Sequence, residues 1–282
     1  MITGALLINK EKGKTSRQEV NAVSRVLHEK KIGHIGTLDP FADGLLIVLA
    51  GRATKIAPFI EQLDKTYLAK LKLGQKTDTG DEDGNVIEEK NVPVLERSKI
   101  NEILQQFLGK SLQTPPKYSA LKVNGERAYA LARKNVDFEL KKREIEVFEI
   151  ALVNFNGKDE ITFICRVSKG TYVRTLAEDI AEKLGTVGHL IELSRLKIGK
   201  YSVENSMKAV DVKIENLISI DEMLKDFPSV FVENEEAKKA KNGVPLCFKQ
   251  NHELIVVKDN EGPIAMYELT NGSLYHCLRG LR

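Results

Sequence analysis

The run LLIVLAG at residues 45–51 is the segment that most limits how this chain can fold. A continuous aliphatic run of this length, without alternation of polar and apolar residues, predicts a strand that is buried on both faces. The fold must therefore place a layer of structure on each side of this strand. The run directly follows GHIGTLDPFADG (33–44), whose three glycines predict a loop that can approach another molecule closely.

The remaining patterns mix helices and strands without strict alternation. Apolar residues at helical spacing predict a helix at 15–30, with Thr15 or Ser16 as its N-cap, and a second helix at 171–185. This mixture predicts an α+β fold whose central sheet is mixed, largely antiparallel and flanked by helices. Further helices are expected at 53–63, 98–109 and 189–196, and further strands at 5–10, 65–74, 143–156 and 160–170.

Length and sequence texture predict two domains. The chain has 282 residues, of which 42% are hydrophobic, enough for one large core and a small second domain. From about Asp226, short strand-like segments are separated by turns, which predicts a small β-rich domain at the C-terminus. We therefore expect one domain at 1–225 and a second at 226–282.

Composition and short motifs argue against several classes of protein. The net charge of +3 is only mildly basic, so nucleic-acid binding would have to come from local clusters of charge. The three cysteines lie far apart, which disfavours a disulfide framework or a zinc site. KGKTS (12–16) lacks the first glycine of a phosphate-binding loop, and GHIG (33–36) does not open a helix as a dinucleotide fingerprint does. We expect no metal, no organic cofactor and no membrane span, and a cytoplasmic protein.

The glycine-rich loop also begins an ordered series of motifs. GHIGTLDPFADGLL resembles the catalytic loop of the TruB family of tRNA pseudouridine synthases. Similar segments follow in the family's order over the part of the chain before residue 200, and five matches in order are far more specific than one. These segments are GRATK (51–55), DKTYLAKLKLGQKTDTGDEDG (64–84), PPKYSALKVNGERAYALAR (115–133), SKGTYVRTLAEDIAEKLG (168–185) and HLIELSRLKIG (189–199).

The resemblance implies the pseudouridine synthase fold and the isomerisation of uridine 55, in the T-loop of tRNA, to pseudouridine by base flipping. Nothing is added or removed overall, so this reaction requires no cofactor. The implied partner is the tRNA T-stem-loop, bound by a monomer without an obligate protein partner. The insert at about 114–143 is expected to form a mobile, RNA-binding flap. The C-terminal segment resembles the RNA-binding PUA domain that members of the family often carry.

Three residues carry the chemistry that the resemblance implies. Asp39 is the expected nucleophile, because a carboxylate can attack either the uracil ring or the ribose, and the sequence leaves that choice open. Arg174 would keep this carboxylate ionised in a dry pocket. Tyr67 would stack on the uracil and transfer a proton at C5. On the residue patterns alone, Tyr67 fits a core aromatic and Arg174 fits a surface arginine.

Other residues are expected to bind the RNA. His34 would stack where the target base leaves the loop, and Asp81 would contact flipped bases. Leu193 would pack under the uracil, and Tyr172 would shape the pocket. The patterns also fit a solvated acidic turn at Asp81 and a plain core residue at Leu193. The cations expected to hold the RNA backbone are Lys10, Lys117, Lys122, Arg127 and Arg133.

Two alternative functions share these features. A protein that holds or refolds the T-loop without chemistry would need the basic clusters but not Asp39 beside an arginine. A guide-RNA-dependent synthase subunit would usually carry a longer basic extension than this chain has. The sequence departs from the family pattern at Glu11, where proline is usual, and at Asp43, where threonine or serine is usual. The effect of both departures stays open.

Overall fold

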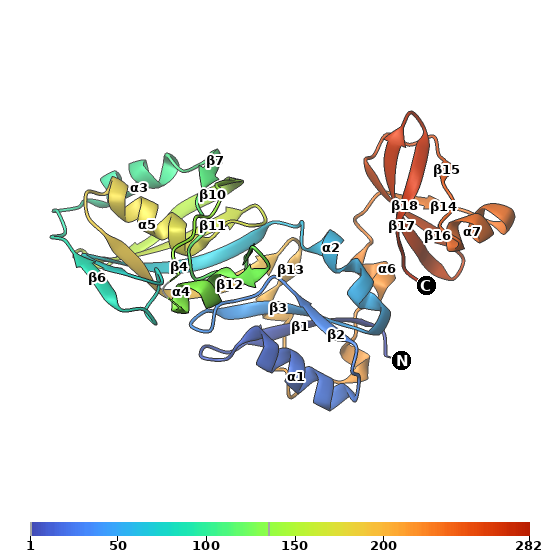
Figure 1. The fold of residues 1–282 in the computed structure, drawn as a ribbon, viewed down its shortest axis with the longest axis horizontal. Helices are drawn as coiled ribbons and strands as arrows, with labels where there is room; N and C mark the ends of the chain where they lie inside the picture. The colour runs from blue at the N-terminus through green and yellow to red at the C-terminus, as the bar shows by residue number, and fades with distance from the viewer. Residues whose placement is uncertain (1, 135) are drawn as a thin grey trace.

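The computed structural model of the chain describes residues 2–134 and 136–282. A nine-stranded mixed sheet forms its centre, and a separate five-stranded sheet forms the C-terminal part (Figure 1). The predicted fold class is therefore confirmed. Met1 and Asn135, which fall in the predicted first domain and flap, lie outside the described residues.

The central sheet joins strands from distant parts of the sequence. Its strands are β1 (Gly4–Lys10), β2 (Ile32–Ile35), β3 (Asp43–Ala50), β4 (Lys65–Leu73), β7 (Gly109–Gln113), β10 (Arg143–Phe155), β11 (Glu160–Val167), β12 (Gly188–Ile198) and β13 (Tyr201–Ser202). Its main path runs β1-β3-β12-β4-β11-β10-β7, with β2 beside β3 and β13 beside β12. Over the described residues, its one parallel pairing joins β12 to β3.

The aliphatic run forms β3, and it is buried on both faces as predicted. Alternate side chains of β3 enter two different hydrophobic clusters, because side chains of a strand alternate between its faces. α1 (Ser16–Leu27) covers one cluster, and its N-cap is Thr15. A 3-10 helix (Gly51–Ile56), α2 (Ala57–Ile60) and α6 (Ile220–Met223) contribute to the other. Proline at the start of α2 is consistent with the short helical segments seen there.

α3 (Arg97–Gln105) and α5 (Val173–Lys183) cover the other half of the sheet. Both helices pack their buried residues on one cluster with β4, β10, β11 and β12. α3 ends earlier than the predicted 98–109, because Gly109, with a φ of 89°, already begins β7. α5 is the helix predicted at 171–185, and Gly185 follows it with a φ of 85°.

The prediction of a short helix at 189–196 is wrong. This segment belongs to β12, a strand between β3 and β4 at the middle of the sheet. Irregularities in the pairing with β4, one of them between Leu190 and Glu192, interrupt the period of two that marks a strand. Leu190 and Leu193 are therefore both buried although they lie three residues apart, a spacing that is also typical of a helix.

The C-terminal sheet has the short strands that the sequence predicts. It consists of β14 (Ser229–Phe231), β15 (Leu246–Cys247), β16 (Leu254–Asp259), β17 (Gly262–Asn271) and β18 (Leu274–Gly280), with α7 (Asn234–Lys241) beside it. It has a hydrophobic cluster of its own, and Val256, Met266 and Leu281 join the cluster beneath β3. The two parts therefore share a packed interface. Among the described helices, none is long and apolar enough to cross a membrane.

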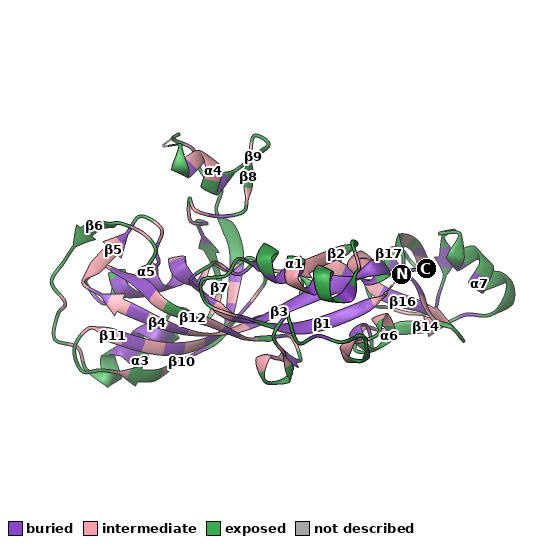
Figure 2. Cartoon of the chain, turned by 90° about the horizontal axis from the view of Figure 1, so that it is seen from below, coloured by how far each residue is buried: buried purple, intermediate pink, exposed green. Residues whose placement is uncertain are grey.

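The flap (residues 114–143) projects away from the central sheet (Figure 2). It carries β8 (Lys122–Val123), β9 (Glu126–Arg127) and α4 (Ala128–Arg133). Asn124 and Gly125 join the two strands with φ values of 50° and 90°, which confirms the predicted hairpin. The acidic segment 78–85 follows β5 (Gln75–Thr77) and leads to β6 (Val86–Glu89).

Candidate active site

Asp39 lies in the loop that joins β2 to β3. The backbone N–H of Ala42 donates to Asp39 O at 3.2 Å, so the chain turns tightly after the aspartate. The Asp39 side chain is 35% exposed. It is therefore open to a substrate while its backbone is anchored next to the buried β3.

Arg174 lies in the first turn of α5 and pairs with Asp39. Arg174 Nε is 3.0 Å from Asp39 Oδ2, and the arginine side chain is only 4% exposed. Arg174 Nη2 also donates to Tyr118 O at 2.8 Å, at the base of the flap. A buried guanidinium thus links the exposed carboxylate to the root of the flap.

Asp81 lies on the other side of the same guanidinium. Asp81 Oδ2 is 3.3 Å from Arg174 Nη1, which also donates to Thr79 O at 2.7 Å. Burial raises the pKa of Asp81, and the Thr79 hydroxyl and Arg174 oppose this rise. Asp81 is 5% exposed, so the interpretation of this position as a solvated acidic turn is wrong. The arrangement places one arginine between two carboxylates.

A cavity of about 670 Å³ opens in front of Asp39. Tyr67 on β4, Leu193 on β12 and Tyr172 before α5 all line it together with Asp39 and Arg174. Gln113 fixes Tyr172, because its side chain accepts from Tyr172 N at 2.8 Å and donates to Tyr172 O at 3.1 Å. The fold thus brings together five residues that the sequence placed in or beside a catalytic site.

The loop that carries Asp39 is held from behind by buried side chains. Ser16 Oγ accepts from Leu38 N at 3.0 Å and donates to Leu38 O at 3.2 Å. Arg195, which is 1% exposed, donates to Gly36 O and to Leu45 O, each at 2.8 Å. These contacts fix the loop on both sides of Asp39.

Lys10 has a different position from the predicted one. It was expected among the exposed cations that hold the RNA backbone, but the structure buries it completely. Lys10 Nζ donates to Ala42 O at 2.5 Å and to Pro40 O at 3.4 Å, so it anchors the loop that carries Asp39 instead. Burial lowers the pKa of Lys10 to about 8, and the negative charges of Glu19 and Asp43 oppose that shift.

Lys10→Met is expected to lower the free energy of unfolding by about 1–3 kcal/mol, because buried carbonyl groups of the loop lose their donor. Urea unfolding followed by circular dichroism measures this change. Lys14→Met is the matched control, because the Lys14 side chain is 47% exposed and its substitution should change stability by no more than about 0.5 kcal/mol. Equal stability of Lys10→Met and the wild type would contradict the anchoring role.

Of the other predicted RNA-binding residues, some line the cavity and some do not. His34 lies on β2, with Nε2 3.2 Å from Thr37 Oγ1, and it is not among the residues that line the cavity. Arg127 on the flap does line the cavity. Lys117 pairs with Asp137 at 3.3 Å, and Arg133 stacks over the Tyr129 ring with its Cζ 5.8 Å from the centroid. Lys122 lies exposed on β8.

Several cavity-lining residues were missed from the sequence. They are Lys65, Ser119, Arg143, Lys169 and Arg195. Lys65 could have been found, because it precedes Tyr67 by two residues on one strand and therefore shares its face. Lys65 Nζ donates to Glu61 O and Leu63 O, each at 2.6 Å, and burial lowers its pKa to about 8. The others come from separate elements that only the fold brings together.

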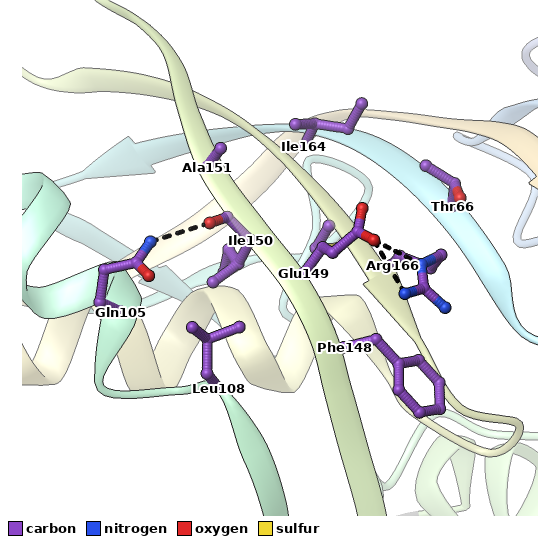
Figure 3. Close-up of a pocket in the computed structure, with 10 residues that line it drawn as sticks. Thr66, Gln105, Leu108, Phe148, Glu149, Ile150, Ala151, Ile164 and Arg166 are labelled. Atoms are coloured by element: carbon purple, nitrogen blue, oxygen red, sulfur yellow. Dashed lines mark hydrogen bonds and ion pairs between the residues drawn. The ribbon is translucent and has the colours of Figure 1, made fainter.

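A second hollow lies where the pairing of β10 with β11 is irregular, between Val147 and Glu149, and it shares no lining residue with the cavity at Asp39 (Figure 3). Its walls include Leu108, Phe148 and Ile150. Its charged groups are already paired, because Arg166 Nη2 is 2.8 Å from Glu149 Oε1. Cys165 also lines this hollow, but burial raises the pKa of its thiol to about 12, which makes it a poor nucleophile. In the described part of the chain, no three histidine, cysteine or acidic side chains are grouped to hold a metal ion.

The sequence from residue 24 to 226 matches two known domains. Residues 24–173 match the N-terminal domain of the TruB family pseudouridylate synthases, and residues 174–226 match the C-terminal domain of tRNA pseudouridylate synthase B. The chain belongs to the TruB family. The predicted family and enzyme class, an isomerase, are thereby confirmed.

Curated relatives match this TruB family member over most of their length. The tRNA pseudouridine synthase B of Clostridium kluyveri is 42% identical over 247 residues, which cover 86% of this chain and 85% of the relative. The protein of the same name from Aquifex aeolicus is 41% identical over 271 residues, covering 94% and 92%. That from Mesoplasma florum is 34% identical over 281 residues, covering 99% and 98%.

Solved structures of lower identity share the fold. The archaeal box H/ACA sRNP Nop10-Cbf5 complex contains a chain with 19% identity and a TM-score of 0.74, covering 99% of this chain and 86% of that one. A Cbf5-Nop10-Gar1 complex gives 20% identity, the same TM-score, and coverage of 99% and 85%. At these identities the similarity supports the pseudouridine synthase fold alone.

Proposed function

We propose that this chain isomerises the uridine at position 55, in the T-loop of tRNA, to pseudouridine, with Asp39 as the nucleophile. The observation that carries the assignment of roles is the contact between Arg174 Nε and Asp39 Oδ2, at 3.0 Å, at the wall of a cavity large enough for a nucleoside. The buried guanidinium holds the Asp39 carboxylate at the cavity wall, and a carboxylate in this position can act as a nucleophile. Family membership and relatives named tRNA pseudouridine synthase B support tRNA as the substrate.

The reaction breaks the bond between N1 of uracil and C1′ of ribose and forms a bond from C5 to C1′. The C5 proton leaves and N1 gains a proton, so atoms balance without a cofactor. Asp39 can attack the ring or C1′, and either route needs one ionised carboxylate held close to the flipped base. The Arg195 and Ser16 contacts hold the loop backbone in one arrangement.

Tyr67 is the proposed partner for the C5 proton, because it lines the cavity from β4, which pairs with β12, the strand that carries Leu193. Tyr67→Phe keeps the ring and removes only the hydroxyl. We expect the single-turnover rate to fall by about 10²–10⁴-fold with little change in tRNA affinity. Rapid-quench tritium release and filter binding separate these two quantities. Tyr201→Phe, a buried tyrosine outside the cavity, should keep the wild-type rate, and an unchanged rate for Tyr67→Phe would remove Tyr67 from the chemistry.

The proposal extends to how the RNA is held. The flap, with Lys117, Lys122, Arg127 and Arg133, closes over the T-stem-loop, and His34 stacks where the uridine has left. Residues 226–282 act as a PUA-like RNA-binding domain beside the catalytic domain at 1–225. The enzyme acts in the cytoplasm as a monomer without an obligate protein partner.

Tritium release from tRNA transcript labelled at C5 of uridine tests the proposed reaction. Wild-type protein, without added cofactor, is expected to release one tritium per tRNA. A transcript with cytidine in place of uridine 55 should release none. Tight binding of the transcript without tritium release would refute the enzyme and favour a protein that only holds or refolds the T-loop.

A further inference from the structure

The cavity is lined by hydrogen-bond donors that the proposed chemistry does not use. Ser119, at the base of the flap, is only 5% exposed, and its Oγ has no hydrogen-bond partner among the described residues. A buried hydroxyl without a partner destabilises the free protein. Ser119 is one of the residues that line the cavity, so a polar group of a bound ligand is a natural partner for its hydroxyl.

Arg143, the first residue of β10, lines the same cavity and has no hydrogen bond or ion pair through its side chain among the described residues. The other lining cations are already engaged. Lys65 donates to carbonyl groups of the chain, and Arg174 pairs with Asp39. The remaining engaged cations are Arg127, which donates to Ala120 O, Lys169, which donates to Gln62 Oε1, and Arg195, which donates to Gly36 O.

Tyr172 lines the same cavity as Ser119 and Arg143. Burial raises the pKa of Tyr172, and the Ser119 hydroxyl and the positive charge of Arg143 both oppose that rise. The geometric observation is that all three residues line one cavity, and no hydrogen bond of acceptable geometry satisfies Ser119 Oγ among the described residues. Asp39, whose charge also acts on Tyr172, is itself paired with Arg174.

Two hydroxyls and a free guanidinium form a cluster rich in donors. Such a cluster matches an anionic oxygen better than the edge of a uracil, because uracil presents both an N–H donor and carbonyl acceptors. An RNA strand supplies anionic oxygens at each phosphodiester, and protein contacts to phosphates position the strand. An enzyme that flips a nucleotide must also hold the backbone on which that nucleotide turns.

We propose that Ser119, Tyr172 and Arg143, which line one cavity, form a subsite for the RNA phosphodiester next to the flipped uridine. This inference rests on the proposed function and adds to it a contact to one phosphate. The subsite fixes the rotated backbone so that the uridine enters the cavity at Asp39. It also provides the partner that Ser119 Oγ lacks in the free protein.

A cycle of protein and RNA changes tests the contact with Arg143. Synthetic T-arm hairpins carry a neutral methylphosphonate at one linkage on either side of the target uridine, and filter binding gives the dissociation constant. Arg143→Gln is expected to weaken binding of the all-phosphate hairpin by about 10–100-fold and to reduce the salt slope by about one. At one of the two linkages, the neutral group should weaken binding by the wild type to a similar extent. The same neutral group should weaken binding by Arg143→Gln by less than a further factor of about three. If the Arg143→Gln substitution and the neutral group weaken binding independently of each other at both linkages, the proposal is overturned.

Ser119→Ala gives a second test, because a binding role and a structural role predict opposite effects on the melting temperature and on RNA affinity. Removing an unpaired buried hydroxyl should leave the melting temperature of the free protein unchanged or raised, while binding weakens by about 10-fold. A lower melting temperature with unchanged binding would show that Ser119 is structural and overturn its place in the subsite. Ser24→Ala is the matched control, because Ser24 Oγ donates to Glu29 O at 2.7 Å, so its loss should lower stability without affecting binding.

The binding readout keeps this inference separate from the proposed reaction. Arg97→Gln, an exposed arginine of α3 outside the cavity, should bind every hairpin as the wild type does. Tritium release from the same hairpins reports the reaction independently. A wild-type protein that binds without release would refute the reaction, and the cycle of dissociation constants would still decide the subsite.

Discussion

Asp39→Asn is expected to lower the single-turnover rate of pseudouridine formation by about 10⁴-fold or more, because the amide cannot act as the covalent nucleophile. The substitution is nearly isosteric, and the Asp39 backbone is held by contacts that do not involve its side chain. The variant should therefore fold and bind tRNA. Rapid-quench tritium release measures the rate, and filter binding measures the affinity.

Asp43→Asn is the matched control for this result. Asp43 lies four residues further along, at the start of β3, and its carboxylate accepts a hydrogen bond from Ser194 Oγ. An asparagine can still accept that hydrogen bond, so the rate should change by less than about 10-fold. A rate for Asp39→Asn within 10-fold of the wild type would contradict the role of Asp39, whatever its effect on binding.

Arg174→Met is expected to lower the free energy of unfolding by about 3–5 kcal/mol, because it leaves two carboxylates without their buried partner. Arg174 contacts Asp39 and Asp81 and also donates to the backbone of Tyr118. The rate of isomerisation should fall by at least about 10²-fold, since Asp39, the proposed nucleophile, loses the cation that holds its carboxylate in place. Urea unfolding and single-turnover tritium release measure the two effects.

A double variant separates stability from catalysis at this site. Arg174→Met together with Asp81→Asn removes the uncompensated buried charge of Asp81, so part of the stability should return while the rate stays low. Arg166→Met is the control, because Arg166 is 36% exposed and pairs with Asp64 and Glu149 near the surface, where ion pairs contribute about 0–1 kcal/mol. Wild-type stability of Arg174→Met would contradict the account of the buried pair.

The sequence predicts those parts of the fold that depend on local patterns. The aliphatic run that became β3, the capped helix α1 and the Asn124-Gly125 hairpin each follow from residues within a short window. β12 was mistaken for a helix because pairing irregularities beside Leu190 shift its buried positions. Those irregularities depend on β4, which is distant in sequence, so no local pattern reports them.

The candidate site likewise contains residues that the sequence identifies and residues that only the fold reveals. Asp39 and Arg174 were identified through motifs that resemble a known family, and their contact follows only from the fold. In the sequence, Lys10 looks like a solvated basic residue. Its hydrogen-bond acceptor, the Ala42 carbonyl, lies far along the chain and comes close only when the loop folds back over β1. Ser119 and Arg143 carry no motif that singles them out, and they gain significance only from the cavity that they share.

The central claim is that this chain makes pseudouridine in the T-loop with Asp39 as nucleophile. Carbodiimide treatment and primer extension on unmodified tRNA, after incubation with wild type or Asp39→Asn, test it most directly. The account predicts a single stop at position 55 with the wild type and none with the variant. A stop at position 55 with both proteins, or with neither despite tight tRNA binding, would contradict it.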